Sequence, residues 1–116
     1  MPARSSVRVL VVFVTCPSAA VARRLARYLV RRRLAACVTV VPQLTSYFHW
    51  AGKLERARET LLILKTTAGA FAPLRRALLA LHPYDSPEII ALPVVAGHAA
   101  YLRWVRTSVR DRGNRQ

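Results

Sequence analysis

The side chains best suited to hold a soft metal ion in this chain are two cysteines and three histidines: Cys16, Cys37, His49, His82 and His98. Soft metal ions favour thiolate and imidazole ligands of this kind. No two of them stand at the CxxC or HxxxH spacing of a local metal motif. The local signal for a metal ion is therefore weak, and the fold has to bring any ligands together.

Three of these residues are the candidate metal ligands. Cys16 stands at the end of an apolar strand, directly before Pro17, where loops gather. His82 opens the two-proline loop HPYDSP, although it could instead cap the C-terminus of the preceding helix. Cys37 lies inside an apolar strand, where a free cysteine commonly acts as a small buried hydrophobe. Two cysteines do not make a disulfide framework, so both are expected as free thiols.

Lys65 is the charged residue with the most apolar sequence environment, because it follows four apolar residues in a predicted strand. A buried lysine needs a partner, and Glu88 after the two-proline loop is the candidate. Two interpretations stay open. The pair is either a structural ion pair at a subunit contact or part of a cleft that binds a small anion or a metal complex.

The motif content argues against catalysis. The chain has no GxSxG, Walker, GxGxxG or HExxH pattern. Its five acidic residues form no evident dyad. We therefore expect a protein that is not an enzyme.

The net charge is +14, and 17 of the 19 basic residues are arginine. Such a charge makes nonspecific attraction to anions plausible. The apolar strand TLLILKT, however, lacks the aromatic residues on which RNA-recognition domains stack bases. No specific nucleic-acid partner is expected.

At 116 residues the chain predicts one domain, over residues 7–109, with flexible termini at 1–6 and 110–116. No apolar run approaches the roughly 18 to 20 residues of a membrane helix, and the first residues lack a signal-peptide pattern. A cytoplasmic protein is expected, without a membrane partner. The hydrophobic fraction of 53% favours a subunit that buries apolar surface against copies of itself.

The hydrophobic pattern predicts strands over 7–15, 34–41, 60–67 and 88–95, and helices over 18–32, 70–82 and 98–109. Pro42 is expected to close the second strand, before an extended segment over 45–50 and a turn over 51–53. Pro73 is expected in the first turn of its helix. Residues 54–59 are expected as exposed strand ends. The last helix is expected to bury Tyr101, Leu102, Trp104, Val105 and Ser108.

This order is β-α-β-β-α-β plus a terminal helix, which predicts an α+β ferredoxin-like sandwich with an antiparallel sheet. In that topology the strands over 7–15 and 60–67 are central and the second strand lies at an edge. Pro93 indicates that the last strand lies at an edge as well, or that a bulge occurs there.

Three segments in order, LAACVTVVPQLTSYFHWAGKLE, ETLLILKTT and HPYDSPEIIALPVVAGHAAYLRWV, closely resemble the CutA family of divalent-cation tolerance proteins. The resemblance covers about residues 8–108. It implies a homotrimer in which the long hairpin crosses to neighbouring subunits, and a role in tolerance of copper or other divalent cations. A small-molecule sensor like the PII signalling proteins is the alternative, by analogy of fold.

The resemblance also implies a ligand site, because the family pattern is matched at each of its positions. These positions are Lys65, Glu88, Tyr84, Trp50, Tyr101 and Trp104. The aromatic members could instead be trimer packing. The chain departs from the family at Arg56 and Arg58, which intervene among the usual acids, and at Thr39, where asparagine is common.

Overall fold

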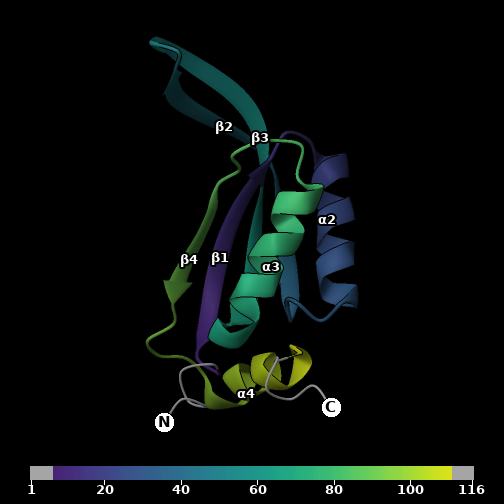
Figure 1. Cartoon of the computed structure of the whole chain (residues 1–116). Coiled ribbons are helices and arrows are strands. Elements are labelled where there is room, and N and C mark those ends of the chain that lie inside the picture. The colour runs from purple at the N-terminus through teal and green to yellow at the C-terminus, as the bar shows by residue number, and fades with distance from the viewer. Residues whose placement is uncertain (1–6, 111–116) are drawn as a thin grey trace.

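The structure is a computed structural model that describes residues 7–110 (Figure 1). Its elements follow the expected order. They are β1 (Val9–Cys16), α2 (Ala19–Arg31), β2 (Cys37–Trp50), β3 (Lys53–Thr67), α3 (Ala68–Leu81), β4 (Ile89–Pro93) and α4 (Ala99–Ser108). The four strands form one antiparallel sheet in the order β2-β3-β1-β4. The ferredoxin-like prediction, with the first and third main strands central, is confirmed.

Strands β1 and β3 alternate between two faces, as a half-covered sheet requires. On β1 the buried positions are Val12, Val14 and Cys16, which lie opposite Leu64, Leu62 and Thr60 of β3. Helices α2 and α3 pack together on this face (Figure 1). The main core therefore lies between the helical layer and one face of the sheet.

Helix α2 begins where the sequence predicts. The Ser18 hydroxyl accepts a hydrogen bond from the Val21 amide at 3.2 Å, so it is a true N-cap. Ala22, Leu25 and Leu29 form the buried stripe at helical spacing. The arginines of α2 lie on the opposite, exposed side.

The prediction that Pro42 ends the second strand is wrong. Strand β2 continues to Trp50 because Pro42 and Gln43 form a bulge opposite the single residue Thr60. A bulge tolerates a residue without a ladder donor, and Gln43 adopts a left-handed φ of 64°. Strand β3 is correspondingly longer than the predicted 60–67.

The result is a long two-stranded arm. Strand β1 ends opposite Thr60, so β2 and β3 continue beyond the sheet as a hairpin (Figure 1). Ala51 and Gly52 turn the hairpin with φ values of 53° and 79°. At its tip, Trp50 is 70% exposed.

Two further expectations about helices are wrong. Helix α3 starts at Ala68, directly after β3, so Pro73 is its sixth residue rather than part of its first turn. Tyr101 and Trp104 of α4 are 41% and 45% exposed. Helix α4 lies across the end of the sheet opposite the hairpin and buries only a narrow stripe around Val105.

The second face of the sheet is apolar and only half-covered. Within residues 7–110, α2 and α3 leave it uncovered, and α4 meets it only at one end, where Tyr101 lies beside Cys37. It presents Val11 and Phe13 of β1, Leu61 and Ile63 of β3, and Ile90 and Leu92 of the edge strand β4. We call this surface the open face. Monomers rarely leave so large an apolar patch in contact with water.

The flexible termini predicted at 1–6 and 110–116 lie outside the described residues, except for Arg110. Residues 1–6 and 111–116 are not described. The Arg110 amide donates to the Arg33 carbonyl at 2.8 Å, so the main chain is still anchored at that point.

Candidate functional site

A buried carboxylate organises the end of the sheet at the base of the hairpin. Glu59 of β3 is only 8% exposed. Its two carboxylate oxygens accept hydrogen bonds from the Ser46 hydroxyl at 2.7 Å and from the Tyr84 hydroxyl at 3.0 Å. The expectation that Glu59 lies in an exposed strand end is wrong, because Tyr84 from the two-proline loop covers it.

The bulge in β2 decides that Ser46 can reach Glu59. Before the bulge, Val41 pairs with Leu61; after it, Leu44 pairs with Glu59. Because β2 has one extra residue at the bulge, its odd-numbered side chains share a face with the odd-numbered residues of β3 before the bulge, and its even-numbered side chains do so after it. Ser46 thereby lies on the same side of the ladder as Glu59.

His82 ties the two-proline loop to β1. The Tyr84 amide donates to His82 Nδ1 at 3.1 Å, so the neutral ring carries its proton on Nε2. Nε2 then donates to the Thr15 carbonyl at 2.8 Å. Both ring nitrogens are used, and a metal ion would have to replace one of these hydrogen bonds.

Cys16 belongs to the same region, which we call the sheet-end cluster: Cys16, Ser46, Glu59, His82 and Tyr84. Burial, and then the Glu59 carboxylate, raise the pKa of the Cys16 thiol from 9.0 to about 11. Burial and the hydrogen bond to Glu59 likewise raise the pKa of Tyr84 to about 12. Near neutral pH the cluster therefore holds a protonated thiol and a protonated phenol.

The raised thiol pKa predicts that stability falls in alkaline solution. The folded state keeps the Cys16 proton up to about pH 11, whereas the unfolded chain releases it near 9.0. The stabilisation is full below about pH 9 and is lost as pH rises through about 11. Melting temperatures measured at pH 8 to 11 should fall less steeply in Cys16→Ala than in the wild type. Parallel slopes would show that Cys16 does not contribute.

A second cluster lies at the far end of the sheet, beside α4. Lys65 Nζ donates to Cys37 Sγ at 3.6 Å, and this sulfur lies 3.9 Å from the Tyr101 hydroxyl. The ring of Tyr101 packs against Trp104 with centroids 5.6 Å apart. Partial burial and the Cys37 thiol raise the pKa of Tyr101, against the opposing effect of the Lys65 ammonium.

The structure separates the three residues predicted as metal ligands. Cys16 lies on the helix-covered face opposite Thr60, and Cys37 lies on the open face opposite Lys65. Five residues of β3 separate these positions, or about 16 Å. Cys16 and His82 share the sheet-end cluster, and Cys37 does not belong to it. Across residues 7–110, no three His, Cys, Asp or Glu side chains are grouped to hold a metal ion.

The residues predicted to bind a ligand fall into separate places in one chain. Lys65, Tyr101 and Trp104 share the second cluster, and Tyr84 belongs to the sheet-end cluster. Trp50 lies at the hairpin tip, 15 residues before Lys65 in the sequence and about 40 Å along β3. These side chains can share one site only if neighbouring copies bring them together.

The expected pair of Lys65 with Glu88 does not form within the chain. Val11 of β1 pairs with Lys65 on one side and with Leu92 of β4 on the other, so Leu92 is the residue of the edge strand level with Lys65. Glu88 is four residues before Leu92, or about 13 Å away along the chain. Lys65 meets a thiol and a phenol instead. A Lys65–Glu88 pair between copies stays a prediction.

Sequence reasoning missed Glu59 and Ser46. Neither stands in a recognisable motif, and their contact depends on the bulge and on the loop that carries Tyr84. The charged residues around Glu59 in the sequence predicted a solvent-exposed segment instead.

Comparison with known proteins gives the family. Residues 10–108 match the family model described as CutA1 divalent ion tolerance protein. The chain belongs to this family. A divalent-cation tolerance protein CutA from Thermus thermophilus is 51% identical over 96 residues, which cover 83% of this chain and 93% of that protein.

Other CutA proteins agree with the described fold. A solved structure of the divalent cation tolerance protein from Thermus thermophilus superposes with a TM-score of 0.86 at 48% identity, covering 88% of this chain and 99% of that one. A relative from Arabidopsis thaliana, named as a chloroplastic CutA protein, is 42% identical over 102 residues. These residues cover 88% of this chain and 56% of the plant protein. The CutA resemblance expected from the sequence is confirmed.

Proposed function

We propose that the protein acts in divalent-cation tolerance as a non-catalytic homotrimer that binds copper or another divalent cation. Membership of the CutA1 family carries the first part of this proposal. The open face and the protruding hairpin support the assembly, because both present apolar side chains that a neighbouring copy would cover.

The sheet-end cluster is the proposed metal site. Its thiol, imidazole and carboxylate come from three different elements, at Cys16, His82 and Glu59, near one end of the sheet. Within one chain these three side chains are not grouped to hold an ion, so the site needs further donors. The donors are not free in one chain, since the thiol is protonated and both nitrogens of His82 are used. Binding must displace the thiol proton, and donors from a second copy or water complete the coordination.

This proposal predicts copper binding that depends on Cys16 and on pH. Isothermal titration with Cu²⁺ at pH 6.5 and 8.0 should show higher affinity at pH 8.0, because the thiol loses its proton more readily there. Cys16→Ser should weaken binding at least tenfold. Cys37→Ser is the matched control, since it removes the other thiol from the opposite face of the sheet, and should change affinity less than twofold.

The titration also separates this function from its alternative. If neither cysteine variant weakens copper binding, the sheet-end site is wrong. A PII-like sensor of a small anionic ligand would then be favoured, because Lys65 presents a half-buried ammonium beside Cys37 and Tyr101 on the open face.

We place the protein in the cytoplasm as part of this proposal. Its two cysteines are free thiols, as a reducing compartment would keep them. Within residues 7–110, no helix has the length and apolar character needed to cross a membrane.

A further inference from the structure

The helices of this protein, α2, α3 and α4, carry many arginines and contain no acidic residues. Helix α2 and the turn after it hold six exposed arginines: Arg23, Arg24, Arg27, Arg31, Arg32 and Arg33. Helix α3 adds two exposed arginines, Arg75 and Arg76. None of α2, α3 and α4 contains an Asp or a Glu. The positive side chains therefore lack neutralising neighbours within their own helices.

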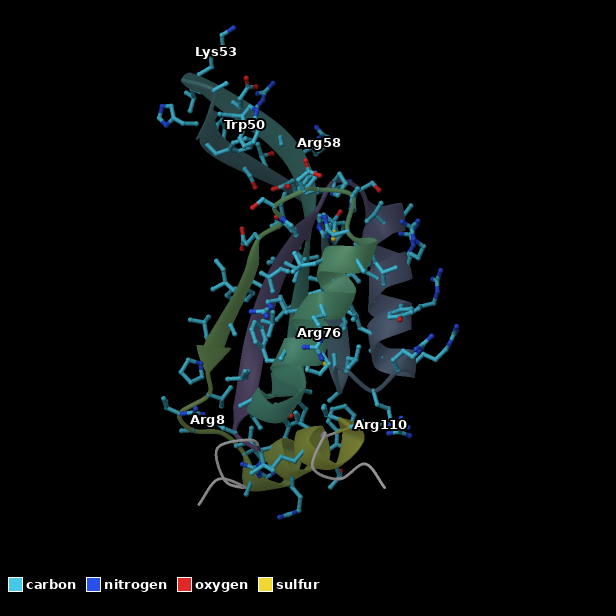
Figure 2. The ribbon with its side chains drawn as sticks, viewed as in Figure 1. Arg8, Trp50, Lys53, Arg58, Arg76 and Arg110 are labelled. Atoms are coloured by element: carbon cyan, nitrogen blue, oxygen red, sulfur yellow. The ribbon has the colours of Figure 1, made fainter. Side chains whose placement is uncertain are left out.

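The acidic residues gather toward the other end of the molecule. Within residues 7–110 they are Glu55, Glu59, Asp85 and Glu88, on β3 and on the loop between α3 and β4. Figure 2 shows nitrogen-tipped side chains projecting from α2 away from the sheet, with Arg76 on the same layer and Arg110 near the far end of α2. The fold thus separates the arginines of the helices from the acidic residues, whereas the sequence composition gives only the net charge.

The stability of α2 does not explain this arrangement. Arg23 and Arg27, and again Arg27 and Arg31, stand at i and i+4, where like charges disfavour a helix. The helix macrodipole accounts for positive charge in the last turn, at Arg31, but not for Arg23 in the first half. A polyanion bound along α2 would remove the repulsion.

Contacts hold the C-terminal part of this surface in place. The guanidinium of Arg32 lies over the Tyr28 ring, 4.8 Å from its centroid. Arg33 Nη1 donates to the Ser108 carbonyl at 3.2 Å, and the Arg110 amide donates to the Arg33 carbonyl at 2.8 Å. These bonds join the end of α2 to the end of α4, so the positive surface continues from one helix to the next.

We propose that the exposed side of α2, continued by Arg32, Arg33 and Arg110, binds the phosphodiester backbone of nucleic acid without sequence preference. Guanidinium groups bind phosphate through paired hydrogen bonds. Arg23 to Arg31 span about 12 Å of helix, over which one strand of a duplex advances by about three to four nucleotides, at about 3.4 Å of axis each.

The surface fits a nucleic acid better than a lipid membrane. A helix that binds a membrane inserts large apolar side chains between the headgroups. Ala22, Leu25 and Leu29 of α2 are buried in the core, and the one large apolar side chain that α2 leaves exposed is Val30, at 41%. Its one aromatic residue, Tyr28, lies beneath Arg32.

This inference does not rest on the proposed metal function. The arginines lie on the helical layer, and the open face lies on the other side of the sheet. An assembly that covers the open face would leave α2 accessible and would multiply its charge. Linked copies of a weak site bind one long ligand more tightly than a single copy does.

The test compares two triple variants of the full chain that lose the same charge from different places. Arg23→Gln/Arg27→Gln/Arg31→Gln alters α2. Lys53→Gln/Arg56→Gln/Arg58→Gln alters the hairpin, where Figure 2 places Lys53 and Arg58. Fluorescence anisotropy with labelled 24-base-pair duplexes of two unrelated sequences gives affinity from 50 to 300 mM NaCl. Light scattering and circular dichroism check that both variants keep the wild-type mass and melting temperature.

We expect wild-type protein to bind both duplexes at 150 mM NaCl with affinities within twofold of each other. The α2 variant should bind at least tenfold more weakly, with a salt slope shallower by about 2 to 3, since each lost phosphate contact removes roughly 0.9. The hairpin variant should change the slope by less than about 1.

Three outcomes would overturn the proposal. Equal losses in the two variants would mean that only net charge matters. Absence of duplex binding at 150 mM NaCl would remove nucleic acid as a ligand. Binding to phosphatidylserine vesicles without binding to the duplex would identify a lipid surface instead.

Discussion

An Ile63→Arg variant is expected to run as a 13.0 kDa monomer, and the wild type is expected to run as a trimer with a total mass of about 39 kDa. Ile63 lies in the middle of the open face, between Phe13 on β1 and Thr39 on β2. In the proposed trimer this position is buried against neighbouring copies. A guanidinium there must lose its water without gaining a partner, which costs several kcal/mol per copy.

Light scattering coupled to size exclusion measures the masses directly. Leu79→Arg is the matched control, because it introduces the same charge at a leucine that is 50% exposed on α3, in the helical layer. It should keep the wild-type mass. A wild-type mass near 13 kDa, or an Ile63→Arg variant that keeps the wild-type mass, would refute assembly through the open face.

The second large effect is on the core. Leu78→Ala should lower the free energy of unfolding by about 2 to 5 kcal/mol, because the removed methyl groups leave a cavity among close-packed neighbours. Leu78 has no exposed surface and packs in the cluster between α2, α3 and the sheet. Urea denaturation followed by circular dichroism measures the change.

The neighbouring residue provides an internal control for that experiment. Leu79→Ala makes the same chemical change in the same helix, at a side chain that is half exposed. It should cost less than about 1 kcal/mol. Equal losses at the two positions would mean that the helix itself, rather than burial of Leu78, determines the effect.

The order of the elements could be predicted from the sequence because it depends on local patterns. Strands β1 and β3 are long apolar runs, and the α2 stripe repeats at helical spacing after Ser18. Their apolar character also identified them as the central strands. The boundaries were less well predicted, since Pro42 is typical of a strand end but lies here at a bulge of an edge strand, where proline is tolerated.

The helical layer gives a similar contrast. The sequence shows a net charge of +14 and clusters of arginine, which predict attraction to anions but no place for it. The tertiary structure sets α2 and α3 side by side and moves Glu55, Glu59, Asp85 and Glu88 toward the hairpin end. Because the structure localises the positive charge on the helices, variants that lose the same charge from different places can be compared.

By itself the sequence determined the order of the helices and strands, the ferredoxin-like topology and the family, because each follows from residues that are close in the chain or from segments that match in order. The tertiary structure alone decided which side chains share a site. It placed Cys16 and Cys37 on opposite faces, separated Lys65 from Glu88, and buried Glu59 against Ser46 and Tyr84. Such neighbours depend on strand register, where a single inserted residue such as the one in the β2 bulge reverses the face of every side chain beyond it.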